Sequence, residues 1–127
     1  DDKYKYKLIH TPKQTVYASR PHKYQDGYKV FISTTDKYKV FVDNCGMTQS
    51  IVFILCKNEE YANKYVKILE HPLYVFINNI CRWGNFNNIR ILQSFPIPNI
   101  EYSGDTMEIY NYFNITNEEI DYISTNL

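Results

Sequence analysis

Glycine is scarce in this chain of 127 residues, and the four that occur, Gly27, Gly46, Gly84 and Gly104, are widely separated. Loops that cradle a nucleotide phosphate or a sulfonium cofactor need clustered glycines, because the backbone approaches the ligand closely there. The sequence therefore predicts no such loop, and we expect this chain to bind no cofactor by itself.

Cysteine is also sparse, and the three cysteines lack the close doublet that a zinc site needs. Cys56 and Cys81 lie in apolar patterns, which favours buried free thiols in a reducing compartment. We expect the scattered histidines to cap helices or face solvent rather than bind a metal: His10, His22 and His71. No Cys–His pair is evident for nucleophilic catalysis, so we expect neither a metal site nor a catalytic residue in this chain.

Long apolar runs and a signal peptide are both missing, so we expect a cytoplasmic protein with no membrane partner. The length and the 44% hydrophobic content suit one domain over residues 1–127. Because the sequence begins at Asp1 rather than at methionine, we expect this domain to be a C-terminal fragment of a longer polypeptide.

Lysine and arginine are absent from residues 91–127, which contain six acidic residues. All 14 basic residues lie in residues 1–90, against eight acidic ones, so the two parts have net charges of +6 and −6. The basic part is able to lie on phosphate groups while the acidic part faces elsewhere. A solvated surface with accidental asymmetry is the alternative.

The first half of the sequence predicts strands, over about residues 4–57. Side chains alternate over residues 28–33 and 38–43, and residues 34–37 between them suit the turn of a hairpin. Asp26-Gly27 marks another turn just before this hairpin. Residues 51–55 are apolar throughout, which favours a strand buried on both faces.

The pattern changes to helical spacing after residue 57. Asn58 is placed to cap a helix with one apolar face, made of Tyr61, Tyr65, Val66 and Leu69. Pro72 suits the first turn of the next helix, which Gly84 would end. The apolar stripe of that helix is expected at Leu73, Phe76, Ile77, Ile80 and Cys81.

The last third of the sequence predicts a short strand over residues 89–95, an extended exit at Pro96 and Pro98, and two helices. Each helix has a capping-box pattern, Asp105 with Glu108 and Thr116 with Glu119. The final apolar face is expected at Ile120, Ile123 and Leu127. Strands first and helices later indicate an α+β fold, with N-terminal antiparallel β-hairpins and a buried strand packed against C-terminal helices.

One guanidinium, one indole and three amides occur within Arg82-Trp83-Gly84-Asn85-Phe86-Asn87-Asn88. Arginine and asparagine are well suited to bidentate contacts with base edges, and indole and guanidinium planes stack on bases. The segment therefore favours nucleic-acid recognition over bond-making chemistry. The structural alternatives are a core position for Trp83 and local backbone hydrogen bonds for Asn87 and Asn88.

Several segments follow one another in a characteristic order. They are a Tyr/Lys hairpin, residues 41–50, a buried strand, a helix ending in Ile68-Leu69, residues 72–77, residues 82–88, Phe95-Pro96-Ile97-Pro98 and a tail over residues 109–120. This order resembles the C-terminal target-recognition domain of TaqI-type adenine-N6 DNA methyltransferases and fused restriction–modification enzymes, and distantly the specificity subunits of type I systems. The resemblance covers most of the chain.

The resemblance implies a division of labour between two domains. The family's catalytic Asn-Pro-Pro-Tyr motif and its S-adenosylmethionine loop do not occur here, so they would belong to an N-terminal portion of the parent chain. That catalytic methyltransferase domain, with or without endonuclease activity, would flip the target adenine out of double-stranded DNA. The present domain would grip the same duplex and read the flanking base pairs in the major groove.

The candidate DNA-binding residues follow from these roles. Base contacts are expected from Arg20, Arg82, Asn85, Asn87 and Asn88, with Trp83 as a stacking platform. Phosphate contacts are expected from Lys13, Lys23, Lys37 and Lys39, of which Lys37 and Lys39 are equally compatible with a solvated hairpin. Supporting contacts are expected from Thr34, Thr35, Asn44, Thr48, Gln49 and Ser50. Recognition by one surface predicts a contiguous basic face that contains Arg20, Lys23 and Arg82.

Two other functions are compatible with the sequence. A protein-interaction or structural domain, for example a viral one, predicts an exposed tyrosine patch and no basic groove. A small nuclease requires carboxylates that converge in a pocket, and Glu59, Glu60 and Lys64 share a predicted helix. Solvated charges on a helix surface account better for those three residues.

Overall fold

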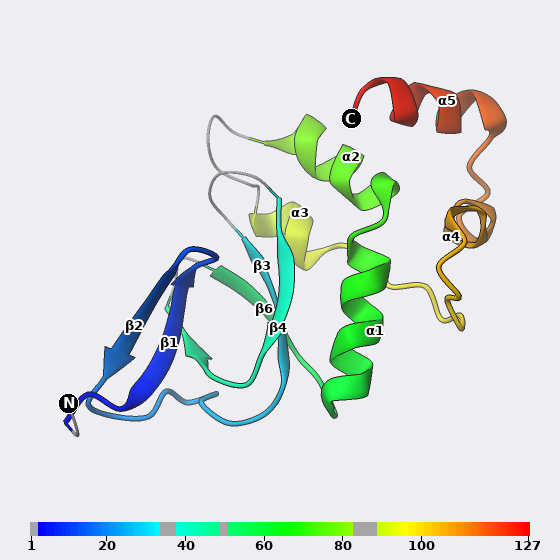
Figure 1. The fold of residues 1–127 in the computed structure, drawn as a ribbon. Helices are drawn as coiled ribbons and strands as arrows, with labels where there is room; N and C mark the ends of the chain where they lie inside the picture. Colours follow the sequence, from blue (N-terminus) through cyan, green and yellow to red (C-terminus); the bar gives the residue numbers. More distant parts are fainter. Residues whose placement is uncertain (1–2, 34–37, 49–50, 83–88) are drawn as a thin grey trace.

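Strands occupy the first half of the chain and helices the second, as the sequence predicts (Figure 1). The computed structural model describes residues 3–33, 38–48, 51–82 and 89–127, although the side chain of residue 89 lies outside this description. These residues form two three-stranded sheets and five helices, which confirms the α+β class.

The first sheet has the strand order β2-β1-β5. Strands β1 (Tyr6–Thr11) and β2 (Gln14–Ala18) form an antiparallel hairpin. Strand β5 (Gly46–Met47) pairs in parallel with β1, so that Leu8 is opposite Gly46. This short parallel pair joins segments that are far apart in the sequence, and no local pattern predicted it.

Gly46 lies where no side chain fits. A Cβ atom on Gly46 would lie 2.5 Å from Leu8 Cδ2, 2.7 Å from His22 Cβ and 2.9 Å from Gln25 Oε1. The Cβ of His22 is bonded directly to the backbone, so it cannot rotate away. We therefore expect Gly46→Ala to lower the free energy of unfolding by about 1–3 kcal/mol, as measured by urea denaturation. An unchanged urea midpoint would contradict this expectation.

The second sheet has the strand order β4-β3-β6 and is antiparallel throughout. Strand β3 (Lys29–Ser33) pairs with β4 (Val40–Asp43), which confirms the predicted hairpin. Strand β6 (Ile51–Leu55) is an edge strand, and Leu55 is 53% exposed. The expectation that residues 51–55 are buried on both faces is therefore wrong for the end of β6. The central strand β3 is the one with all five residues buried.

Lys29 is fully buried at the start of β3. Its ammonium group donates to the backbone oxygens of Asp26, at 3.2 Å, and Gly27, at 2.6 Å. Gly27 has a φ of +100°, a conformation that glycine adopts without strain. Burial lowers the pKa of Lys29 from its ordinary value. The lysine thus fastens the turn that precedes the central strand.

Helix α1 (Glu59–Leu69) lies along the second sheet. The side chain of Asn58 accepts a hydrogen bond from the Tyr61 amide at 2.9 Å, which confirms the predicted cap. Ala62, Ile68 and Leu69 are the buried residues of this helix. Tyr61 is 41% exposed, so its assignment to the buried face was wrong.

Helix α2 (Pro72–Cys81) begins with Pro72 in its first turn, as predicted. Leu73 is buried, but Ile80 is 65% exposed and Cys81 is only half-buried. The interior positions belong instead to Tyr74 and Asn78. Phe76 and Ile77 are half-buried and pack against the main core, so the predicted apolar stripe faces the core up to Ile77 and fails at Ile80. The expectation of a buried Cys81 thiol is wrong.

Residues 89–93 form helix α3 (Ile89–Gln93), so the predicted strand over residues 89–95 is wrong. Helix α3 packs against β6 and α2 and buries Leu92. Its backbone bonds close locally, with the Ser94 amide donating to the Ile91 carbonyl at 3.1 Å. Local hydrogen bonds satisfy the backbone groups of this segment, and Leu92 packs in the core, so the segment needs no strand partner.

The last two helices are α4 (Thr106–Tyr112) and α5 (Asn117–Thr125). Thr116 and Glu119 form the predicted capping box at α5. Asp105 caps α4, but Glu108 accepts hydrogen bonds from Ser103 rather than from the cap backbone, so no capping box forms there. Ile123 is buried and Leu127 is 57% exposed, so the predicted last apolar face ends before Leu127.

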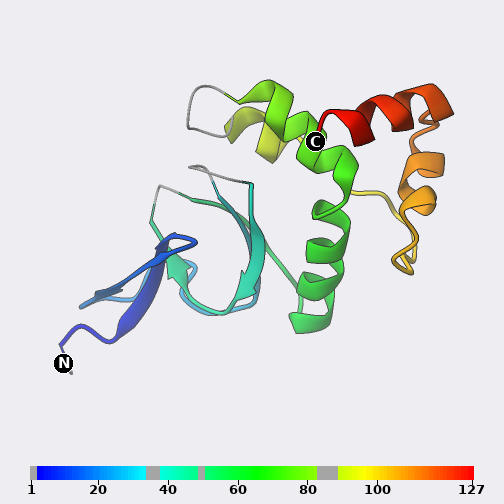
Figure 2. The same ribbon diagram turned by 45° about the horizontal axis from the view of Figure 1, so that its top comes forward.

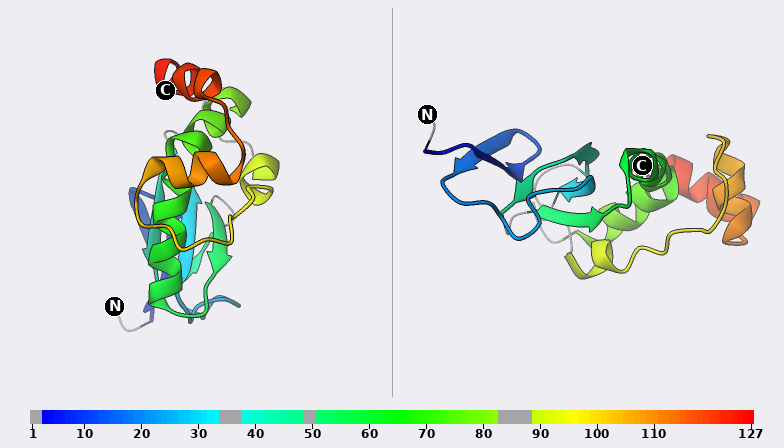
Figure 3. Two further views of the ribbon diagram at one scale, coloured as in Figure 1. Left: turned by 90° about the vertical axis from the view of Figure 1, so that its right-hand side faces the viewer. Right: turned by 90° about the horizontal axis from the view of Figure 1, so that it is seen from below.

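The main core lies between the second sheet and helices α1 to α5, and a smaller core lies between the two sheets. Cys45 belongs to the smaller core, and burial raises the pKa of its thiol to about 11. The predicted burial of Cys56 is confirmed. Figures 2 and 3 show the sheets on one side of the molecule and α4 and α5 on the other, with α1 between.

None of the helices described here combines the length and the apolar character that crossing a bilayer requires.

Candidate nucleic-acid interface

Several chain segments reach the same end of the molecule, here called the loop end (Figure 1). At this end the turn between β1 and β2 occurs, β3 ends, β4 and β6 begin, and α2 gives way to α3. Ser33, the last residue of β3, pairs with Ile51, the first of β6. Tyr38 donates a hydrogen bond to the Leu69 carbonyl at 2.7 Å, which holds the end of α1 against the same end of the sheet.

Lys39 lies at the loop end with its side chain exposed. Its backbone amide donates to Ser33 Oγ at 2.9 Å, and its carbonyl accepts from the Ser33 amide at 3.0 Å. These two bonds fix the backbone of Lys39 while the ammonium group projects from the sheet. A lysine whose backbone is fixed and whose ammonium group is exposed is well suited to contact a phosphate.

Lys13 and Thr48 reach the loop end from the first sheet. Lys13 is exposed in the turn between β1 and β2, and its amide donates to Thr11 Oγ1 at 3.3 Å. Thr48 Oγ1 lies 2.8 Å from His10 Nδ1, and the Thr48 amide donates to the Ile9 carbonyl. Thr48 therefore ties the approach to β6 to the end of β1, which is a structural role at the candidate interface.

Arg82 follows the last turn of α2 and has an extended backbone conformation. Its side chain is half-buried, and its Nε atom is buried with no hydrogen-bond acceptor among the residues described. A guanidinium group that is partly withdrawn from water and keeps donor capacity suits an oxyanion or a base edge.

Arg20 and Lys23 lie in the connection from β2 to β3, at the opposite end of the strands from Lys13 and Lys39. The same connection is fastened near the start of β1, because Gln25 Nε2 donates to the Lys7 carbonyl at 2.9 Å. Lys23 is exposed, with its ammonium group 5.3 Å from the Tyr24 ring centroid. The expected single basic face with Arg20, Lys23 and Arg82 is therefore not formed.

Asn44 has a structural partner within the chain. Its side-chain oxygen accepts a hydrogen bond from the Gly27 amide at 2.8 Å, which links the turn before β3 to the loop after β4. Its neighbour Asp43 pairs with Lys7 at 2.8 Å. Asn44 thus also lies away from the loop end, and its acceptor is already used.

Nine of the candidate residues lie outside the described residues, and their predicted roles stay predictions: Thr34, Thr35, Lys37, Gln49, Ser50, Trp83, Asn85, Asn87 and Asn88.

The prediction that the histidines cap helices or face solvent is confirmed for His71 alone, because His10 and His22 are half-buried and hydrogen-bonded outside helices. His71 caps α2, and His22 Nδ1 accepts from the Tyr24 amide at 2.9 Å. Among the residues described, no three His, Cys, Asp or Glu side chains are grouped to hold a metal ion.

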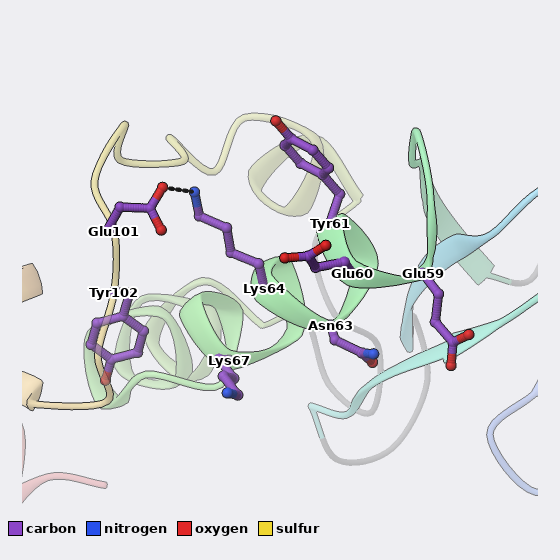
Figure 4. A pocket seen from close by; sticks show the side chains of 8 residues that line it. All are labelled: Glu59, Glu60, Tyr61, Asn63, Lys64, Lys67, Glu101 and Tyr102. Atoms are coloured by element: carbon purple, nitrogen blue, oxygen red, sulfur yellow. Dashed lines mark ion pairs between the residues drawn. The ribbon is translucent and has the colours of Figure 1, made fainter.

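A cavity of about 630 Å³ lies beside α1, and Figure 4 shows its lining. Lys64 pairs with Glu101 at 3.6 Å across this cavity, while Glu59 points away from Glu60. The carboxylates on α1 thus do not converge as the nuclease alternative requires. Glu59 and Glu60 are exposed, as expected for solvated charges on a helix, whereas Lys64 is half-buried and paired with Glu101.

Comparison of the chain with family models, curated proteins and solved structures finds no match.

Proposed function

We propose that this chain is a non-catalytic module that recognises double-stranded DNA, of the target-recognition type found in adenine-N6 DNA methyltransferases and restriction–modification enzymes. The loop end is the surface that meets the duplex. The supporting observation is that Lys13, Lys39 and Arg82, which are far apart in the sequence, lie on segments that reach this one end.

The charge distribution supports the same orientation. Residues 91–127 have a net charge of −6, and five of their six acidic residues, from Asp105 to Asp121, lie in or next to α4 and α5, on the side of the molecule away from the sheets. DNA has one negative charge for about every 1.7 Å of helix axis, so an acidic surface near it would be repelled. A duplex at the loop end meets cations first and keeps the acidic helices at a distance.

Each side chain has a separate role in this proposal. Lys13 and Lys39 neutralise phosphates and set the register of the module on the duplex, because charge contacts to the backbone contain no sequence information. Arg82 reads a base edge or binds a phosphate, and the asparagines of residues 85–88 are the proposed base readers. Arg20 and Lys23 lie at the other end of the strands and are assigned no contact with the same groove.

The test compares charge removal at the two ends of the strands. Lys13→Ala/Lys39→Ala removes two charges at the loop end, and Lys5→Ala/Lys23→Ala removes two at the opposite end. Binding to a mixed-sequence duplex of about 30 base pairs is measured by fluorescence anisotropy over a salt series. We expect the loop-end double variant to reduce the salt slope by about 2, since each phosphate contact contributes about 0.9. The control double variant should retain the slope.

Arginine offers a second matched pair. Arg82→Ala should weaken binding by about tenfold, whereas Arg20→Ala should leave the dissociation constant nearly unchanged. Equal effects at the two ends would place the duplex elsewhere on the molecule. Absence of duplex binding at low salt, or binding that is indifferent to salt, would overturn the proposal.

Methyl transfer belongs, in this proposal, to a separate catalytic domain of the parent chain, which would hold S-adenosylmethionine. The residues of this chain position the duplex and perform no bond-making step. A DNA substrate also places the protein inside the cell. The alternative of a protein-interaction domain predicts an oligomer that added duplex leaves unchanged, and size-exclusion chromatography with and without DNA distinguishes the two.

A further inference from the structure

The helices α2 and α5 enclose an apolar groove of about 340 Å³ on the side of the molecule away from the sheets. Its apolar lining comes from both helices and the turn before α5: Leu73, Phe76, Ile77, Ile115, Tyr122 and Ile123. The rings of Phe76 and Tyr122 meet edge-on across it, with centroids 5.8 Å apart. The groove is thus a defined space between two packed helices.

The apolar surface continues beyond the part of α2 that α5 covers. Ile80 follows Ile77 by three residues and Phe76 by four, so the three side chains share one face of α2. Ile80 is 65% exposed, and Tyr122 on the facing helix is 62% exposed. Helix α2 contains no charged residue over its ten positions. Phe76 and Ile77 are half-buried and pack against the main core, and Ile80 extends their apolar face into solvent, where it is available to another apolar group.

The rim of the groove is acidic. Glu118 and Glu119 line it from the first turn of α5, and Asp121 follows in the next turn. Neither α5 nor the rest of residues 91–127 contains a lysine or an arginine to offset these charges. An apolar floor with an acidic rim discriminates by charge, because it attracts basic flanks and repels acidic ones.

We infer that this groove docks an amphipathic helix of a partner protein, with apolar anchors at helical spacing and lysine or arginine on the flank that faces α5. A helix laid across two helices places its i, i+3, i+4 and i+7 side chains into the groove between them. The groove lining contains none of the residues that the DNA proposal uses, namely Lys13, Lys39 and Arg82, so the docking inference does not rest on that proposal.

The probes are two labelled helical peptides of about 16 residues with the same leucine face, one with lysine flanks and one with glutamate flanks. Fluorescence anisotropy with the full chain should give a dissociation constant about tenfold lower for the lysine peptide. Equal binding of the two peptides, or binding of neither, would overturn the inference. The inference would also be overturned if the chain self-associates and a second copy occupies the groove.

Two pairs of exposed residues locate the site. Glu118→Lys should weaken binding of the lysine-flanked peptide by about tenfold. Asp121→Lys makes the same change of charge outside the groove lining and should have a smaller effect. Tyr122→Ala removes an apolar wall, and Tyr112→Ala on α4 is its control because Tyr112 does not line the groove. All four positions are exposed, so circular dichroism should report an intact fold. Equal losses within each pair would contradict the assigned groove.

Discussion

Replacing His71 with alanine is expected to lower the free energy of unfolding by about 3 kcal/mol, because one ring holds two helices. His71 is 2% exposed. Its Nδ1 accepts from the Leu73 amide at 3.0 Å and caps α2, while its Nε2 donates to the Thr106 carbonyl at 2.9 Å. The ring also meets Tyr110 edge-on at 4.6 Å. Urea denaturation of the variant measures the loss.

The same residue gives the stability a pH dependence. Burial lowers the pKa of His71 below its ordinary 6.5, an effect that the hydrogen bond to Thr106 partly opposes. Between pH 6.5 and the lowered pKa the unfolded chain binds a proton that the folded chain does not, so folding weakens as the pH falls. In that window the free energy of unfolding falls by up to about 1.4 kcal/mol for each unit by which the pH is lowered. The stabilising contribution of the neutral His71 ring is fully present at higher pH.

His71→Asn separates the cap from the ring. Asparagine is a strong helix cap but does not titrate, so this variant should lose less stability than alanine and lose the His71 part of the pH slope. If wild type and His71→Asn show the same pH dependence, the buried neutral ring is not its source.

Tyr74→Ala is expected to cost about 3–5 kcal/mol, the other large effect in this molecule. Tyr74 is 1% exposed, its hydroxyl donates to the Pro96 carbonyl, and its ring lies 5.1 Å from that of Phe95. These contacts fix the distance between α2 and the chain leaving α3.

Tyr74→Phe keeps the ring and removes only the hydroxyl, so it should cost about 1 kcal/mol. Tyr122→Ala, which removes an exposed ring, should cost less than about 1 kcal/mol. Thermal or urea unfolding of the three variants measures the series. A phenylalanine variant as unstable as the alanine variant would show that the hydrogen bond, rather than packing, dominates at this position.

Helix ends that are fixed by one or two side chains could be predicted from the local sequence. Asn58, Pro72 and the Thr116/Glu119 pair each satisfy or remove backbone groups at a helix end, and these effects depend on few neighbours. The hairpin of β3 and β4 was predictable for the same reason, since the two strands are adjacent in the sequence.

Burial was harder to predict, because it depends on the order of strands rather than on the composition of one strand. The apolar segment Ile51–Leu55 is an edge strand, whereas Lys29–Ser33 is the central strand, and its buried lysine donates to two carbonyl groups. Residues 89–93 became a helix since packing on β6 overrode a weak strand pattern.

The sequence did not reveal which of the candidate residues lie at the same end of the molecule. Lys13, Lys39 and Arg82 lie on segments that reach the same end, and Arg20 and Lys23 do not, because the direction of β1 and β3 decides which turns are neighbours. Sequence reasoning assigned Asn44 to DNA, where the structure shows a bond to Gly27. The α2–α5 groove had one signal in the sequence, the apolar stripe of α2, which contributes Leu73, Phe76 and Ile77 to its lining.

The molecule has zero net charge, but residues 1–90 have a net charge of +6 and residues 91–127 one of −6, and the two parts fold largely into different regions of the molecule. Such a chain behaves as a permanent electric dipole. The field of a distant polyanion rotates a neutral dipole, and it attracts the dipole only at shorter distances, where the field differs between its two ends. An encounter with DNA would therefore begin with rotation of the protein, which turns its positively charged side toward the duplex. That alignment would fade once added salt shortens the screening length below the size of the protein.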